Sequence, residues 1–231
     1  MNISVTSPPN LSRRTSTVLG CSETQTGLNS PGPAQRYAEI LTSRIANHRG
    51  EIFVAEGTLV LAEFEDAADT VNCAISIQEQ FRDYNKLSLD QGKIEAGVGV
   101  HFGEIFFAEG GYKGSGVEAG RSLATMTPAG KIYITREVFV RIRLLLPLNF
   151  ESLGQKELQG LSEGKELFSV AWEAVTENLE ASLKRLGQDD LQRATRLSTK
   201  IGLGASKRAS PIVMMLFLLF LFVLFKILKW L

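Results

Sequence analysis

The sequence predicts an α+β domain, in which helices pack on one face of a sheet. Three observations favour this class. The segments Glu51–Glu56 and Leu59–Phe64 read as two strands joined by a tight turn at Gly57. A helical pattern follows at once over 67–80. Over 93–107, bulky and small residues alternate, as they do in a strand with one crowded and one open face, and small residues let a helix or another backbone come close.

The remaining elements follow from local signals. Residues 14–21 are interpreted as the first strand, and 33–48 as a helix that ends at a glycine. Asp66 and Asp69 stand at the start of the next helix, where carboxylates bind free N–H groups, so we interpret them as caps and not as metal ligands. A further helix and three strands complete the sheet, over 117–126, 131–135, 149–153 and 166–172.

Composition excludes several classes of protein. The chain has 231 residues, 44% of them hydrophobic, which is enough for one domain core with some chain left over. Its 25 basic and 25 acidic residues cancel, and no basic face with aromatic platforms is present, so no nucleic-acid partner is expected. Cys21 and Cys73 are too few for a disulfide framework or a zinc site.

The C-terminus predicts a membrane anchor. The chain is apolar without a break from Ile212 to Phe225, and Lys226, Lys229 and Trp230 follow. Counted to the last residue, the segment has about 20 residues and would be about 30 Å long as a helix, enough to cross a bilayer. The lysines can reach the far head groups and the tryptophan can anchor at the interface. We therefore expect one transmembrane helix, with membrane lipid as a partner.

These signals divide the chain into four parts. Residues 1–12 are expected to be a disordered leader, because they are polar and have no apolar signal-peptide core. The domain covers 13–173, a helical and flexible linker covers 174–210, and the tail anchor covers 211–231. The linker is either a solvated spacer or a dimeric stalk. Basic residues before the apolar run outnumber the two lysines after it, so the soluble domain is expected in the cytoplasm.

Four motifs carry a family resemblance. They are the hairpin around Gly57, Gly97-Val-Gly-Val-His-Phe-Gly-Glu104, Gly114-Ser-Gly-Val117 and Phe150-Glu-Ser-Leu-Gly154. In this order the sequence resembles the catalytic domain of class III adenylate/guanylate cyclases, from about Arg13 to about Trp172. The resemblance implies a ferredoxin-like class III cyclase fold, self-association into at least a dimer, and a nucleotide site between two such domains.

The resemblance also implies that functional positions of the family are altered here. Family members close a nucleoside triphosphate into a cyclic monophosphate with two divalent ions about 4 Å apart, held by carboxylates. The positions of the two metal carboxylates, the ribose asparagine, the transition-state arginine and the two base-reading residues correspond to Thr17, Thr58, Glu118, Ser122, Val54 and Tyr112. Arg121 lies one residue from the arginine position, a step that turns a helical side chain by about 100°.

From these changes we expect a pseudoenzyme with no metal and no other cofactor. It would be a membrane-anchored, dimeric module that senses a nucleotide or cyclic nucleotide, and its ligand-binding candidates are Val54, Tyr112, Glu118 and Arg121. An effector role at the membrane in bacterial defence is an analogy. Two alternatives are a residual nucleotide cyclase, alone or paired with a complementary domain, and a ligand-free membrane scaffold. A further alternative is an active enzyme whose sequence we have aligned with the family one or two residues out of place. It is disfavoured, because glycines on both sides of the altered positions fix the alignment.

Overall fold

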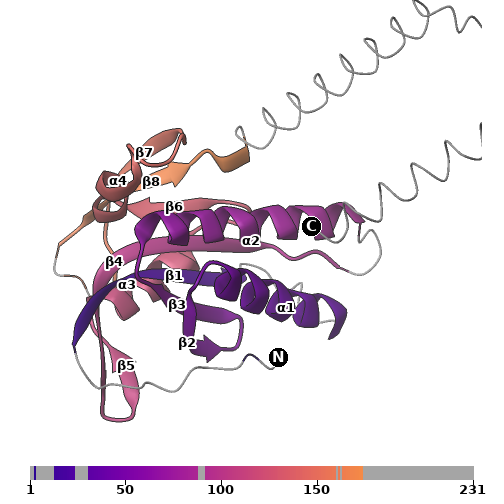
Figure 1. The fold of residues 1–231 in the computed structure, drawn as a ribbon, viewed down its shortest axis with the longest axis horizontal. Coiled ribbons are helices and arrows are strands. Elements are labelled where there is room, and N and C mark those ends of the chain that lie inside the picture. The colour runs from indigo at the N-terminus through magenta and orange to yellow at the C-terminus, as the bar shows by residue number, and fades with distance from the viewer. Residues whose placement is uncertain are drawn as a thin grey trace, which may run out of the picture. The chain divides into compact units, whose positions relative to one another are not determined.

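The computed structural model describes residues 3, 13–23, 31–87, 92–159, 161 and 163–173, all of which belong to one compact unit, Met1–Val175. Figure 1 shows a twisted sheet with helices on both faces. The elements are β1 (Arg14–Glu23), α1 (Pro31–Asn47), β2 (Glu51–Glu56), β3 (Leu59–Phe64), α2 (Ala67–Leu87), β4 (Ala96–Ala108), β5 (Gly111–Lys113), α3 (Ser115–Met126), β6 (Ile132–Thr135), α4 (Arg136–Ile142), β7 (Phe150–Lys156) and β8 (Lys165–Val170).

The strand order is β2-β3-β1-β4-β6-β8-β7, and β5 pairs with β4 beside this path. The pair β4–β6 is parallel, whereas the other pairs are antiparallel. β1 therefore lies in the middle of the sheet, between the predicted hairpin and the long strand β4. The α+β class is confirmed, and so is the position of the hairpin.

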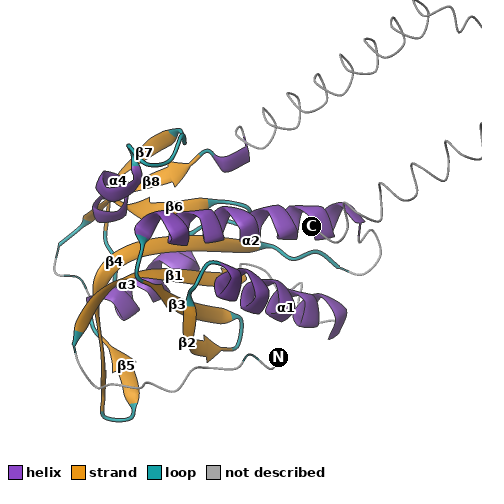
Figure 2. Cartoon of the chain, in the orientation of Figure 1, coloured by secondary structure: helices purple, strands orange, loops and turns teal. Residues whose placement is uncertain are grey.

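Helices cover both faces of the sheet, so the prediction of helices on one face is wrong. Figure 2 shows α1 and α2 in front of the sheet and α3 behind it. The largest core cluster joins α1, α2 and α4 to the sheet, and Val98 and Val100 of β4 belong to it. The alternate residues of β4 lie beneath α3 on the other face. Both faces of this strand are therefore buried.

Glycines on β4 allow α3 to lie directly on the sheet. A Cβ atom added to Gly97 would overlap the backbone oxygen of Thr127, and one added to Gly99 would overlap the side chain of Leu123. A Cβ atom on Gly103 would come within 2.7 Å of the Gly116 nitrogen. The prediction that small residues on this strand admit a close neighbour is thus confirmed, and the neighbour is α3.

Several boundaries differ from the sequence-based prediction. Strand β1 runs on to Glu23, and α2 runs to Leu87, because Phe81 and Tyr84 continue its apolar contact with the core. Neither α4 nor β5 was predicted. The backbone N–H of Asp69 donates to the Asp66 carboxylate at 2.9 Å, which confirms Asp66 as the helix cap.

The predicted membrane residues Ile212, Phe225, Lys226, Lys229 and Trp230 lie outside the described residues. Within the described part of the chain, no helix is both long enough and apolar enough to cross a membrane.

Candidate functional site

The two threonines that the resemblance places at the metal-carboxylate positions of the family lie at opposite ends of a strand pair. Thr17 of β1 pairs with Phe64, the last residue of β3, whereas Cys21 pairs with Val60 near its first residue. Thr58 directly precedes β3. Leu59 and Phe64 are five positions apart, which is about 17 Å along a strand. Two catalytic ions lie only about 4 Å apart, so Thr17 and Thr58 do not form one site.

The end of β1 that lies level with the hairpin turn carries Ser22 and Glu23. The Thr58 carbonyl accepts a hydrogen bond from the Tyr37 hydroxyl at 2.7 Å, which ties the turn to α1. The Tyr37 hydroxyl also lies 3.4 Å from the Cys21 sulfur. Burial raises the pKa of the Cys21 thiol to about 12 and the pKa of Tyr37 well above its usual value. Both side chains are therefore uncharged and have a structural role beside the turn.

A bidentate ion pair joins α3 to the hairpin beside this turn. The two terminal nitrogens of Arg121 donate to the two carboxylate oxygens of Glu56 at 2.7 and 2.9 Å. Glu56 is the last residue of β2, two residues before Thr58. The hydrogen bonds raise the pKa of Arg121 and lower that of Glu56. The Glu56 side chain is 61% exposed, so water and small solutes can reach the pair.

The neighbouring α3 positions have separate roles. Glu118 is exposed in the first turn of α3, and its charge adds to the raised pKa of Arg121. The Ser122 hydroxyl accepts a hydrogen bond from the backbone N–H of Gln159 at 3.3 Å, so this residue holds the segment after β7. Of the predicted site residues on α3, Arg121 contacts the hairpin through Glu56, and Glu118 acts on Arg121 through its charge.

Val54 and Tyr112 lie in one small apolar cluster on the α3 side of the sheet. The cluster contains Val54, Leu61 and Val117, with Tyr112 packed against it. The Tyr112 ring lies 4.8 Å from that of Phe53, centroid to centroid. The structure therefore brings these two candidates together and places them next to the first turn of α3. Glu56, which sequence reasoning missed, completes the region, and only the tertiary packing of α3 on the hairpin could have identified it. Glu23 follows Cys21 by two positions along β1 and therefore lies on the opposite, α1 side of the sheet.

The residues at the family's two metal-carboxylate positions do not fit two magnesium ions. Thr17 is 1% exposed, and its hydroxyl has no hydrogen-bond partner among the described residues. Neither Thr17 nor Thr58 has a side chain that supplies an anionic oxygen. Across the described ranges, no cluster of three or more His, Cys, Asp or Glu side chains is placed to hold a metal ion. Thr17 and Thr58 therefore cannot take the place of the two metal carboxylates.

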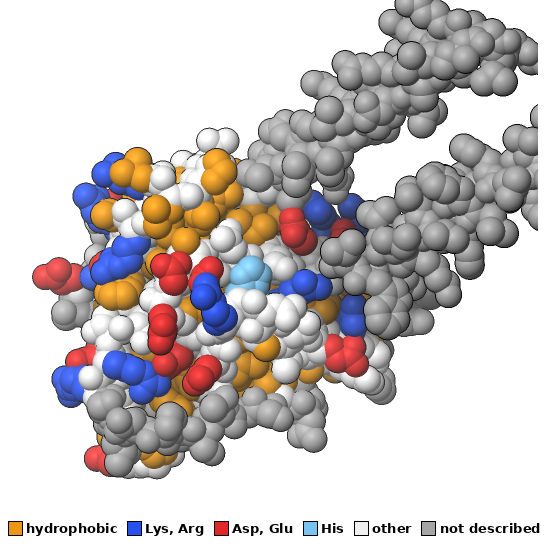
Figure 3. Space-filling model, viewed as in Figure 1, with side chains coloured by type: hydrophobic (Ala, Val, Ile, Leu, Met, Phe, Trp, Pro, Cys, Tyr) orange, Lys and Arg blue, Asp and Glu red, His pale blue; other side chains and the backbone are white. Residues whose placement is uncertain are grey.

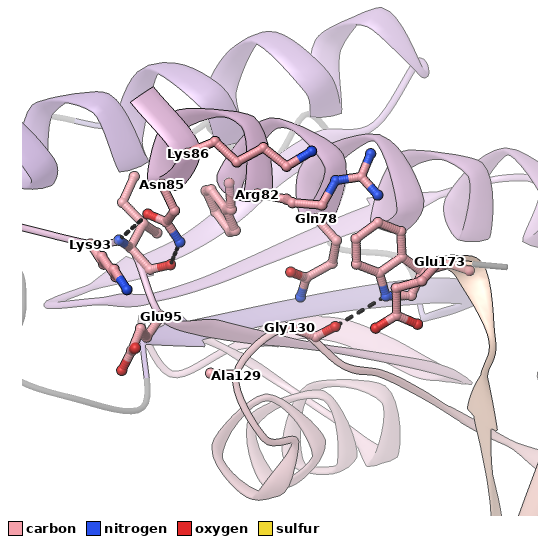
Figure 4. Close-up of a pocket in the computed structure, with 12 residues that line it drawn as sticks. Gln78, Arg82, Asn85, Lys86, Lys93, Glu95, Ala129, Gly130 and Glu173 are labelled. Carbon is pink, nitrogen blue, oxygen red and sulfur yellow. Dashed lines mark hydrogen bonds between the residues drawn. The ribbon is translucent and has the colours of Figure 1, made fainter. Parts of the chain in front are cut away.

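A hollow of about 480 Å³ lies elsewhere, between the end of α2 and Trp172 (Figure 4). Its polar groups hold the fold together. The Asn85 amide forms two hydrogen bonds with the backbone of Ile94, and the Trp172 indole donates to the Gly130 carbonyl. None of the predicted site residues lines this hollow.

Comparisons with known proteins agree with the cyclase resemblance. No family model matches the chain. The putative adenylate cyclase 3 of Rhizobium meliloti (strain 1021) is 25% identical over 126 residues, which is 54% of this chain and 22% of that protein. The chain thus spans about a fifth of the length of this curated relative.

Solved structures show the fold. The adenylate/guanylate cyclase/hydrolase of Silicibacter pomeroyi superposes with a TM-score of 0.62 and 20% identity, over 69% of this chain and 97% of that one. The guanylyl cyclase Cya2 superposes with a TM-score of 0.56 and 22% identity, over 69% of this chain and 93% of that one. The adenylyl cyclase CyaB of P. aeruginosa superposes with a TM-score of 0.54 and 16% identity, over 69% of this chain and 95% of that one. The described domain therefore has the fold of a class III adenylate/guanylate cyclase catalytic domain.

These findings contradict the expectation that the chain is not an enzyme, because the curated relative and these structural neighbours are cyclases. The structure gives a physical reason for the error. The absence of a carboxylate at Thr17 concerns the wrong end of β1, since Ser22 and Glu23 are level with the turn. On the α3 side of this end, the carboxylate of Glu56 lies beside the turn and pairs with Arg121.

Proposed function

We propose that this protein is a signalling enzyme of the nucleotide cyclase type, which binds a purine nucleoside triphosphate at the hairpin end of β1. The observation that carries the proposal is the exposed, bidentate pair of Arg121 and Glu56 beside the Gly57 turn. The same site would take the cyclic product. We refer to Glu56, Thr58, Glu118 and Arg121 as the hairpin site.

The chemistry of this pair suits a phosphate ligand. A guanidinium group matches a phosphate with the same fork of two donors that it now presents to Glu56. Because the Glu56 side chain is largely exposed, it can rotate away from Arg121 toward solvent when a triphosphate binds the arginine in its place. Glu118, one turn earlier on α3, can accept hydrogen bonds from ribose hydroxyls. The triphosphate would then lie along Arg121 and the sugar along Glu118.

We also propose that the protein works as a dimer and is held at a membrane. Self-association would bring the α3 side of two domains together, where the cluster around Val54 and Tyr112 lies beside the hairpin site. The apolar run from Ile212 to Phe225 would anchor the chain, with the catalytic domain in the cytoplasm.

The experiment that tests the proposal measures products and binding together. The full chain, purified in detergent, is incubated with ATP or GTP and Mg²⁺ or Mn²⁺, and cyclic nucleotide and pyrophosphate are separated by chromatography. We expect turnover that Arg121→Gln abolishes. Arg36→Gln, which removes another exposed and paired arginine from α1, should leave turnover unchanged. Absence of both turnover and nucleotide binding in the unmodified chain would contradict the proposal.

A further inference from the structure

Helix α4 and the turn after it present an apolar surface to solvent. Val140 is 52% exposed, Leu144 is 87% exposed and Leu145 is 66% exposed. They are three of the five large hydrophobic side chains exposed on the described part of the chain, and they lie within six consecutive residues. We call these three residues the α4 patch. Contiguous exposed apolar groups of this kind usually mark an interaction surface.

The core does not need the patch, because the opposite side of α4 already fills it. Val138 and Ile142 are fully buried. The Phe139 ring stacks on that of Phe168, with 4.2 Å between the centroids. Leu145 and Leu146 both donate their N–H groups to the Ile142 carbonyl, so the turn has a defined backbone. The buried side of α4 and the hydrogen-bonded turn therefore keep the side chains of Leu144 and Leu145 on the surface.

The rim of the patch is basic. Within 136–149 there are three arginines, Arg136, Arg141 and Arg143, against one acidic residue, Glu137. The Glu137 carboxylate pairs with Lys165 at 2.8 Å, and Arg136 pairs with Glu166 at 2.7 Å. The positive charge of the rim therefore comes from Arg141 and Arg143. The Arg141 guanidinium lies 3.6 Å from the centre of the Phe102 ring. Figure 3 shows hydrophobic and basic side chains next to each other on the side of the molecule where α4 lies. The patch is thus apolar at its centre and positive at its edge.

We propose that the α4 patch is a membrane-contact surface for anionic phospholipid. Leucine side chains can enter the boundary between head groups and acyl chains, while arginines at the rim bind lipid phosphates. A second copy of the chain fits less well, since a two-fold contact would bring the arginines of both copies into one interface. The inference rests on the exposure and charge of the patch, and it stands whether or not the C-terminal run anchors the chain.

The experiment places a fluorophore on the patch of the full chain. Leu144→Cys provides one accessible thiol, because the native Cys21 and Cys73 are buried and burial raises the pKa of each to about 12. The label is environment-sensitive, and quenchers are attached to the acyl chains of the vesicle lipid. Leu87→Cys is the matched control for exposure, since Leu87 is 86% exposed at the end of α2 and lies outside the α4 patch.

We expect the label at position 144 to shift to shorter wavelength and to be quenched in phosphatidylcholine/phosphatidylserine vesicles. It should be quenched far less in phosphatidylcholine alone, and the label at position 87 should remain unquenched in both. Adding Leu145→Gln and Arg143→Glu to the labelled chain should reduce quenching to the level of the Leu87 control. Equal quenching at both positions would overturn the proposal. So would a spectral shift that needs no vesicles and grows with protein concentration, since that result would assign the patch to a second copy.

Discussion

The two ends of the β1–β3 strand pair each carry an arginine–glutamate pair, and the pairs differ in exposure. Arg14 at one end and Arg121 at the other are equally exposed, 32% in each case. Their partners differ, because Glu63 is 17% exposed and Glu56 is 61% exposed. Breaking an ion pair that is shielded from water destabilises the fold, whereas in an exposed pair a ligand can replace the carboxylate at little cost. This difference in exposure supports the proposed nucleotide site at the Thr58 end and favours a structural role for the ion pair at the Thr17 end.

The largest effect is expected where α3 rests on the sheet, since α3 positions Arg121. Gly97→Ala puts a methyl group against the backbone of Thr127. Overpacking of this kind typically costs about 1 to 3 kcal/mol of stability. Because the atoms that the methyl group meets here are backbone atoms, we expect the free energy of unfolding to fall by about 3 kcal/mol. Chemical denaturation measures it. Gly111→Ala is the control, with nothing within 4 Å of the added atom, and an equal loss there would show that α3 packing is not the cause.

A second prediction concerns the face of β4 that supports α3, where His101 is 2% exposed and its Nδ1 lies 3.1 Å from the Thr135 hydroxyl. Burial lowers the pKa of His101 from 6.5 to about 4. The unfolded chain therefore binds a proton that the folded chain does not, between these two values. Stability from this source is complete above about pH 6.5 and is lost as the pH falls toward 4. At pH 5 the loss is about 2 kcal/mol.

The check is the difference in unfolding free energy between pH 7 and pH 5, in the unmodified chain and in His101→Gln. The variant should lose less stability on acidification. Identical pH dependence in the two proteins would mean that His101 is not protonated on unfolding in this range.

A smaller contrast is expected between the two ion pairs themselves. Glu63→Gln leaves Arg14 partly buried beside a neutral group, and we expect a loss of about 1.5 kcal/mol. Glu56→Gln should change stability by less than about 0.5 kcal/mol, because that pair is open to water. The same Glu56→Gln variant should bind nucleoside triphosphates more tightly, since Arg121 no longer has a competing carboxylate. Equal losses of stability would remove the distinction between the two ends.

Much of the fold could be predicted from local patterns. The hairpin was predicted because alternation and a tight turn are encoded within a dozen residues, and the glycines of β4 indicated a close neighbour. Helix α4 was missed because its short sequence, Arg-Glu-Val-Phe-Val-Arg-Ile, is rich in β-branched and aromatic residues that favour strands. Strand β5 has only three residues.

The site was harder to predict, because its members meet through tertiary packing. Arg121 was a candidate from its position near Ser122, but its partner Glu56 lies 65 residues away along the chain. The two approach because Gly120 of α3 sits close to Val18 and Leu61. Thr17 was misplaced for a related reason. A motif in a strand of alternating small and apolar residues does not fix its register, and only the pairing with β3 shows which residues meet the turn.

The most direct test of where the nucleotide binds is hydrogen exchange with a non-hydrolysable triphosphate. The full chain is exchanged with and without a saturating ATP or GTP analogue, and protection is mapped by peptide. We predict protection in the peptides that cover Glu56 to Leu59 and the first half of α3, and none in those that cover 14–17 or 63–66. Protection at the Thr17 end instead, or no protection with either analogue, would contradict the assignment of the hairpin site.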